Sequence, residues 1–231
     1  MDEQLILPEI DNCNWYRFNA DPIAVALIRS EGDGTVALKD MDNDQSVQQE
    51  VQQREYLKLA EEIRQYYKHK LFIGTFYEGF QNNKFRKDLQ KCLERDDILI
   101  VHHTEIGMIA KLPEFYIQDI VKDEIKELCK TDTPFDMTKY NTTMKVEYLR
   151  STMARYGHNI QHSHWFRTED NKAVSFIIEH NNPLVDMFEH YIKNNKWFYL
   201  VGDFYNCAND NFFYYQHSGK IGIKGMSDKY Y

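Results

Sequence analysis

The stretch from Ile160 to Glu179 reads IQHSHWFRTEDNKAVSFIIE, two runs of alternating side chains on either side of a polar centre. Alternation with a period of two is typical of β-strands that bury one face. Asp170 and Asn171 tolerate the positive φ that a two-residue hairpin turn demands. The stretch therefore predicts a β-hairpin in which Asp170 and Asn171 form the turn.

This turn pairs residues whose numbers sum to 341, so that Trp165 faces Phe176 on the side of the core. The opposite face then gathers His162, His164 and Glu179. Two histidines and a carboxylate that leave coordination positions open are the ligand set of a catalytic zinc or a non-haem iron site. The alternative interpretation is an ordinary solvated face of an antiparallel hairpin, where His and Glu are common.

Outside this hairpin the pattern is mixed. Branched residues at Ile23–Arg29 and Thr35–Leu38, separated by a glycine-containing turn, predict an N-terminal hairpin. Helical spacing predicts a helix at 47–68 and another from Val146 to Tyr156, ended by Gly157. Further elements are expected as helices at 85–93, at 113–129 and from Asn182, and as strands at 98–101, 197–205, 212–217 and 221–223.

Because these elements show no regular βαβ alternation, the sequence predicts an α+β protein with antiparallel β-hairpins or sheet and several packed helices. Residues 1–132 carry 17 Lys and Arg against 26 Asp and Glu, whereas residues 133–231 carry 11 against 10. The change falls at Thr131–Asp136. We therefore expect an acidic α+β N-terminal lobe at 1–132 and an aromatic-rich α+β C-terminal lobe at 133–231. One elongated domain is the alternative.

The sequence also indicates the cellular compartment of the protein. The four cysteines at 13, 92, 129 and 207 form no CxxC pair, the N-terminus is acidic where a signal peptide is basic, and no run of about 18 apolar residues occurs. These features predict an intracellular protein, either cytoplasmic or within a viral particle assembled in the host cytoplasm. The residue usage is rich in Asn, Lys, Ile, Tyr and Phe, which is typical of AT-rich genomes and compatible with a viral (phage) source.

Ten aromatic residues lie between Tyr191 and Tyr215, on both faces of the strands expected there. Such strands are either enclosed in the core or laid against a partner. Because only Lys193 and Lys196 accompany the rings within this run, the pattern argues against nucleic-acid stacking, which needs interleaved cations. The residues expected at a protein interface are Trp197, Tyr199, Tyr205, Phe212 and Tyr214.

Three short motifs resemble metal sites and are better explained structurally. Asp40, Asp42 and Asp44 have the initial spacing of a calcium loop, but the glycine and the final glutamate of that loop are missing. The HxE pair of His103 and Glu105, in the run from His102 to Glu105, lies at the expected end of a strand, where polar residues are common. Glu124 and Lys126 resemble the ExK motif of metal-dependent nucleases, but they lie within a predicted helix, where they flank the apolar Ile125.

No phosphate loop, dinucleotide fingerprint, nucleophile elbow or HExxH motif occurs in the chain. The sequence therefore predicts a non-enzymatic protein-interaction or assembly component without a cofactor. Its expected partners are other protein subunits, copies of itself included, rather than a membrane or a nucleic acid. The alternative is a metal-dependent hydrolase or non-haem iron oxygenase that holds one zinc or iron ion on the 160–180 hairpin.

Overall fold

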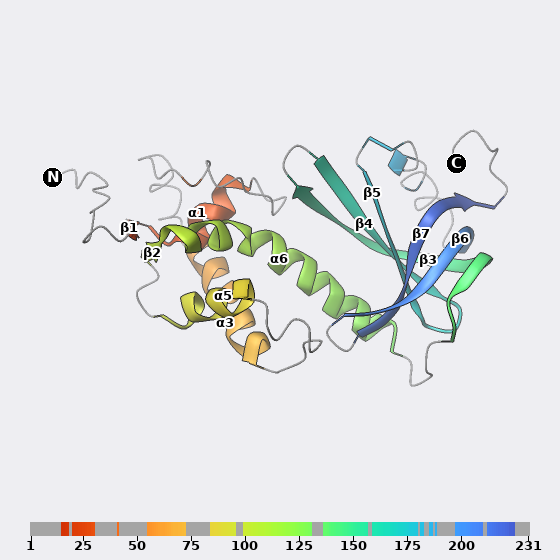
Figure 1. Ribbon diagram of the computed structural model, residues 1–231, viewed down its shortest axis with the longest axis horizontal. Helices are drawn as coiled ribbons and strands as arrows, with labels where there is room; N and C mark the ends of the chain where they lie inside the picture. The colour runs from red at the N-terminus through yellow and green to blue at the C-terminus, as the bar shows by residue number, and fades with distance from the viewer. Residues whose placement is uncertain are drawn as a thin grey trace. The chain divides into compact units, whose positions relative to one another are not determined.

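The computed structural model describes residues 15–18, 20–30, 41, 55–72, 84–95, 99–130, 136–156, 159–179, 181–182, 185–186, 188, 197–209 and 212–224. Helices and strands are both present, which confirms the mixed α+β class (Figure 1). The chain forms two compact units, Met1–Ile117 and Gln118–Tyr231. The boundary between them lies inside helix α6 (His103–Leu128), whereas residues 131–135 of the expected boundary are outside the described residues. The division into lobes at 132 stays a prediction.

Unit 1 contains helices around one apolar core. These are α1 (Pro22–Arg29), α3 (Glu55–Phe72), α5 (Lys84–Glu94) and the first part of α6, with a two-stranded ribbon of β1 (Trp15–Arg17) and β2 (Ile100–His102). The core includes the fully buried side chains of Ile23, Ile63, Ile109 and Leu112. The described parts of the helices expected at 47–68 and 85–93 are confirmed.

The N-terminal strand expected at Ile23–Arg29 is wrong, because these residues form α1. Asp21 is the N-cap, and its Oδ1 accepts hydrogen bonds from the backbone N–H groups of Ile23 and Ala24. Pro22 occupies the first turn, where a missing N–H is harmless. This capping signal outweighs the strand preference of the branched residues. Thr35–Leu38 lies outside the described residues.

Helix α6 also begins earlier than expected. Pro113 lies inside it rather than in its first turn. The helix begins at His103, where Glu105 accepts a hydrogen bond from the backbone N–H of His102 at 2.7 Å. The same carboxylate pairs with Arg95 at 3.2 Å. The HxE pair of His103 and Glu105 is therefore part of the first turn of a helix, and the strand β2 ends directly before it.

Unit 2 is built on a closed five-stranded barrel (Figure 1). The strands are β3 (Lys139–Tyr156), β4 (Asn159–Thr168), β5 (Ala173–Glu179), β6 (Trp197–Asn209) and β7 (Phe212–Ile223). They neighbour one another in the order β3-β4-β5-β7-β6, and β6 pairs back with β3. Only the contact between β5 and β7 is parallel. Closure of the sheet in this order pairs both edges of every strand of the barrel.

The helix expected from Val146 to Tyr156 is wrong, because this segment belongs to the long strand β3. The first half of β3 pairs with β6 and the second half with β4. The pairing with β4 shifts between Tyr148 and Arg150, as at a β-bulge. The bulged residue Leu149 packs against the cluster beneath α6, whereas Val146 lies in the barrel core, so that the spacings of three and four from Val146 to Leu149 and Met153 combine residues of different environments. These spacings imitate a helix.

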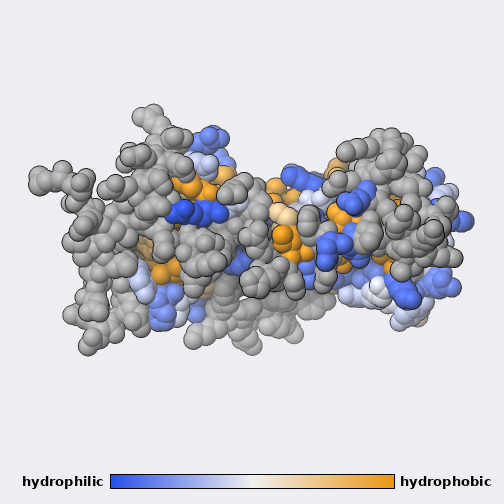
Figure 2. Space-filling view, turned by 90° about the horizontal axis from the view of Figure 1, so that it is seen from above, coloured by the Kyte–Doolittle hydropathy of each residue, from blue (hydrophilic) through white to orange (hydrophobic). Residues whose placement is uncertain are grey.

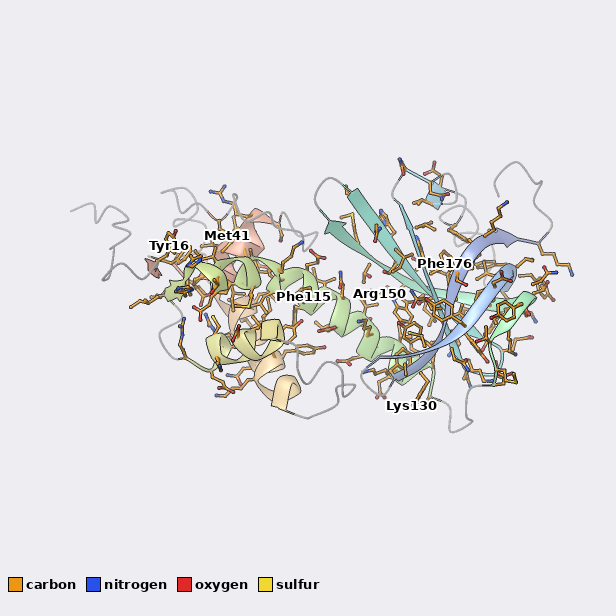
Figure 3. All side chains as sticks on the ribbon, in the orientation of Figure 1. Tyr16, Met41, Phe115, Lys130, Arg150 and Phe176 are labelled. Atoms are coloured by element: carbon orange, nitrogen blue, oxygen red, sulfur yellow. The ribbon has the colours of Figure 1, made fainter. Side chains whose placement is uncertain are left out.

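Aromatic side chains fill the interior of the barrel. Phe166 and Phe176 stack on each other with ring centroids 4.9 Å apart, and Phe188 lies 5.0 Å from Phe176. All three side chains have no exposed surface, and Figure 3 shows Phe176 among the strands of the barrel. Phe188 belongs to the short helical segment after Asn182. The barrel is therefore a packed core rather than a channel.

A second cluster lies where the last turns of α6 meet the strands. Val121, Ile125 and Cys129 are buried there together with Trp165 of β4 and Ala173 of β5. The end of α6 therefore covers part of β4 and β5.

The thiol of Cys129 tests this packing. Burial raises its pKa to about 12, and because only the thiolate is nucleophilic, we expect it to resist iodoacetamide at pH 8 in the native protein. The partly exposed Cys207 should react faster and serves as the internal control. Substitution Trp165→Ala should make Cys129 reactive, as measured by mass spectrometry of its peptide. Rapid alkylation of Cys129 in the unmodified protein would contradict the packing.

Candidate functional site

The two candidate histidine ligands lie on β4 and face the interior of the barrel. His162 pairs with Ile178 of β5, and His164 pairs with Phe176. Their rings stack with centroids 6.0 Å apart and planes inclined by 20°. The structure thus brings the two histidines together, but on the apolar side of the hairpin.

The predicted register of the hairpin is wrong by one residue. The observed pairs sum to 340, and the turn holds three residues, Glu169, Asp170 and Asn171. Asn171 has φ 58°, the left-handed conformation of the last residue in such a loop. Glu179 therefore pairs with Gln161 rather than with His162, and its side chain is outside the described part of the structure. Because neighbouring pairs alternate between faces, this register separates the position of Glu179 from the histidines.

The environment of His164 is almost entirely apolar. Its side chain is 3% exposed and contacts the rings of Phe176, Phe188 and Tyr148. Neither of its ring nitrogens has a hydrogen-bond partner among the described residues. Burial, with a smaller contribution from the charge of His162, lowers the pKa of His164 to about 4. The imidazole is therefore neutral at physiological pH.

No group of three or more His, Cys, Asp or Glu side chains in the described residues is arranged to hold a metal ion. Asp40, Asp42 and Asp44 of the calcium-like motif lie outside those residues. Glu124 pairs with Arg150, and Lys126 lies over the ring of Phe212, so both belong to the packing of α6 on the barrel.

The five aromatic residues expected at an interface divide into two groups. Phe212 and Tyr214 are buried in the cluster beneath α6, where Tyr214 lies 5.1 Å from the ring of Trp165. Tyr199 is 44% exposed, and Trp197 and Tyr205 are partly exposed. Only the second group can contact a partner without rearrangement.

Lysines accompany the exposed rings of Trp197 and Tyr199. On the paired strands β3 and β6, Lys145 lies directly opposite Tyr199, and its Nζ is 5.8 Å from the centroid of the Trp197 ring. The Nζ of Lys224 is 5.6 Å from the centroid of Tyr199. Both distances are within the range of cation–π attraction. We call Trp197, Tyr199, Lys145 and Lys224 the aromatic–lysine face.

A pocket of about 280 Å³ adjoins this face at Lys145. It lies between the first half of β3, the turn of the β4–β5 hairpin and β7. We call it the lysine pocket. Its lining residues are Lys139, Met144, Lys145, Thr168, Glu169, Asp170, Lys172 and Tyr215.

Each lysine of the pocket is paired with a carboxylate. Lys145 pairs with Glu169, which raises the pKa of the lysine. Burial lowers the pKa of Lys172, but its hydrogen bonds to Asp170 and Asp136 outweigh this effect and raise the pKa overall. The ammonium groups of Lys145 and Lys172 therefore remain charged at neutral pH.

Sequence reasoning missed these lysines because they come from three separate segments. Lys139 and Lys145 lie on the half of β3 that pairs with β6, Lys172 follows the hairpin turn, and Lys224 follows β7. The even spacing of Lys139 and Lys145 gives no reliable signal, because the register of β3 against β6 shifts between Lys139 and Thr142. Figure 2 shows hydrophobic and hydrophilic residues side by side on the described surface.

Comparison of the chain with protein-family models, with curated proteins and with solved structures gives no match. Among the helices that the structure describes, none has the length and apolar character that a bilayer-crossing segment needs. The functional argument therefore depends on the aromatic–lysine face, the lysine pocket and the histidine pair.

Proposed function

We propose that the chain is a non-enzymatic interaction or assembly component that docks another protein subunit on its aromatic–lysine face. The observation that carries this proposal is the exposure of Tyr199 beside the partly exposed Trp197, with Lys145 and Lys224 placed over their rings. Tryptophan and tyrosine are the residues most enriched among those that dominate binding energy at protein interfaces.

The cations of this face support a protein partner with complementary charge. Lys145 and Lys224 lie over the rings and are carried by neighbouring strands, so that their approach to the rings is fixed by the barrel. Complementary charge accelerates association and selects among partners more than it adds affinity. The partner can be a second copy of this chain or a different subunit.

The expected result for Trp197→Ala combined with Tyr199→Ala is a loss of partner binding of about 2 kcal/mol or more, because the anchor rings are removed. The measurement has two parts: sedimentation velocity over a range of protein concentrations, and the stoichiometry of any partner that co-purifies from the source cells. Phe213→Ala is the matched control. Phe213 is 55% exposed and lies opposite Ala208, far along β6 from Tyr199.

Support requires that self-association or a stoichiometric partner persists in Phe213→Ala and is lost in the double variant. A protein that stays monomeric and co-purifies with no partner would contradict the proposal. So would a partner that both variants retain equally.

A metal-dependent enzyme is the second candidate function. The observation that favours it is the stacked pair of His162 and His164, since neutral imidazole is the form that binds zinc and iron. A third ligand is needed, because Glu179 does not share the register position of the histidines. The test is the metal content of the purified protein, before and after incubation with zinc or iron. About one equivalent that disappears in His162→Ala with His164→Ala would favour this function over docking.

A further inference from the structure

Three hydrogen-bond donors of the lysine pocket converge on one carboxylate, that of Asp136. The Nζ atoms of Lys139 and Lys172 lie 2.9 Å and 3.2 Å from its oxygens, and the hydroxyl of Tyr215 donates to the same oxygen as Lys172. These donors come from β3, from the end of the hairpin turn and from β7. The barrel thus holds a preformed binding site for a carboxylate, which we call the carboxylate seat. Asp136 of the chain itself occupies it.

The donors and the acceptor of this site differ in burial. Two of the three donors, Lys172 and Tyr215, are buried, whereas the side chain of Lys139 is 35% exposed and that of Asp136 is 53% exposed. Asp136 lies outside the strands, three residues before β3 begins. The barrel therefore fixes the two buried donors, whereas the acceptor is an exposed side chain outside the strands.

The other carboxylates of the lysine pocket are also more exposed than the lysines that they pair with. Glu169 and Asp170, the partners of Lys145 and Lys172, have side chains that are 61% and 64% exposed. Exposed ion pairs contribute little to stability, because water solvates the separated charges well. Exchange of such an internal carboxylate for an external one is therefore inexpensive for the fold. The open volume beside the donors provides the space for an incoming group.

We propose that the lysine pocket receives the carboxylate of an acidic segment of the partner, and that Asp136 is an internal competitor for the same donors. The inference depends on the proposed docking function, because Lys145 belongs to both the pocket and the aromatic–lysine face. A carboxylate is favoured over other anions because the groups that the donors bind in this structure are carboxylates.

The experiment titrates the full-length chain with an acetylated, amidated hexaglutamate peptide at low ionic strength and follows binding by calorimetry. Asp136→Asn should strengthen binding by about fivefold, since it removes the competitor and one negative charge. Lys139→Gln and Lys145→Gln should each weaken it. Asp186→Asn is the matched charge control, because Asp186 is exposed and follows the end of β5 that is remote from the pocket.

The outcomes separate the two proposals. Equal strengthening by Asp136→Asn and Asp186→Asn would show a general charge effect and overturn the carboxylate seat, as would an absence of peptide binding. Tighter binding of a ten-residue oligothymidine than of the peptide would overturn it in favour of a nucleic-acid surface. If a stoichiometric partner is lost in the Trp197 and Tyr199 double variant but retained in Lys139→Gln, the docking function stands and the seat is wrong. Circular dichroism of each variant confirms that it is folded.

Discussion

Phe176→Ala is expected to lower the free energy of unfolding of the barrel by about 3 to 5 kcal/mol. The ring has no exposed surface and contacts Phe166, Phe188 and His164 inside the barrel. Its removal leaves a cavity at the centre of a closed sheet, whose strands cannot move together to fill it. Hydrogen exchange of the β4 and β5 amides, measured by mass spectrometry, reports this loss for unit 2 without assuming that both units unfold together.

The neighbouring residue supplies the control. Ile177 is 49% exposed, and because strand residues alternate between faces, it points away from the barrel interior. Ile177→Ala should change the same exchange rates by less than about 1 kcal/mol. Similar losses in the two variants would mean that the described register of β5 is incorrect.

The sequence predicts the existence of most elements better than their register. The alternating runs at 160–179 correctly indicate two paired strands, and the described residues of β6 and β7 include both aromatic segments assigned to strands. The turn length was the ambiguous point. Asp-Asn at the centre suits a two-residue loop, but Asn171 takes the left-handed position of a three-residue loop instead. Because the turn has one residue more than predicted, Glu179 pairs with Gln161 and not with His162.

The two wrong assignments of element type have distinct causes. At α1, the capping of Ile23 and Ala24 by Asp21 is a sequence signal that branched residues obscured. At β3, no local signal exists for the bulge between Tyr148 and Arg150, because it depends on the change of pairing partner from β6 to β4. Local periodicity cannot reveal a feature that tertiary pairing creates.

The candidate site was less predictable than the fold. Tyr199 and Trp197 were identified from the density of aromatic residues alone, but the same argument included Phe212 and Tyr214, which α6 covers. Lysines 145 and 224 lie far from these rings in sequence, and only the pairing of β3 with β6 and the end of β7 bring them together. Recognition of the site therefore required the topology of the barrel.

Acid is expected to destabilise unit 2 through His164. Its pKa is about 4 in the folded protein, against 6.5 for an unperturbed histidine, so the unfolded chain binds the proton more tightly. Stability should therefore be fully present above about pH 6.5 and fall progressively toward pH 4, by about 3 kcal/mol in total. Burial also lowers the pKa of His217, which contributes with the same sign.

His164→Leu is expected to flatten this dependence, because leucine fills the apolar site and binds no proton. Urea unfolding at pH 7.5 and pH 4.5, followed by exchange of the β4 amides, should show a smaller difference between the two pH values in the variant than in the unmodified chain. His103→Gln is the control, since His103 is exposed on α6 and its replacement should leave the difference unchanged. A nuclear magnetic resonance titration that gave His164 a pKa above 6 would contradict the burial of a neutral imidazole, because only a solvated or hydrogen-bonded ring would hold its proton at that pH.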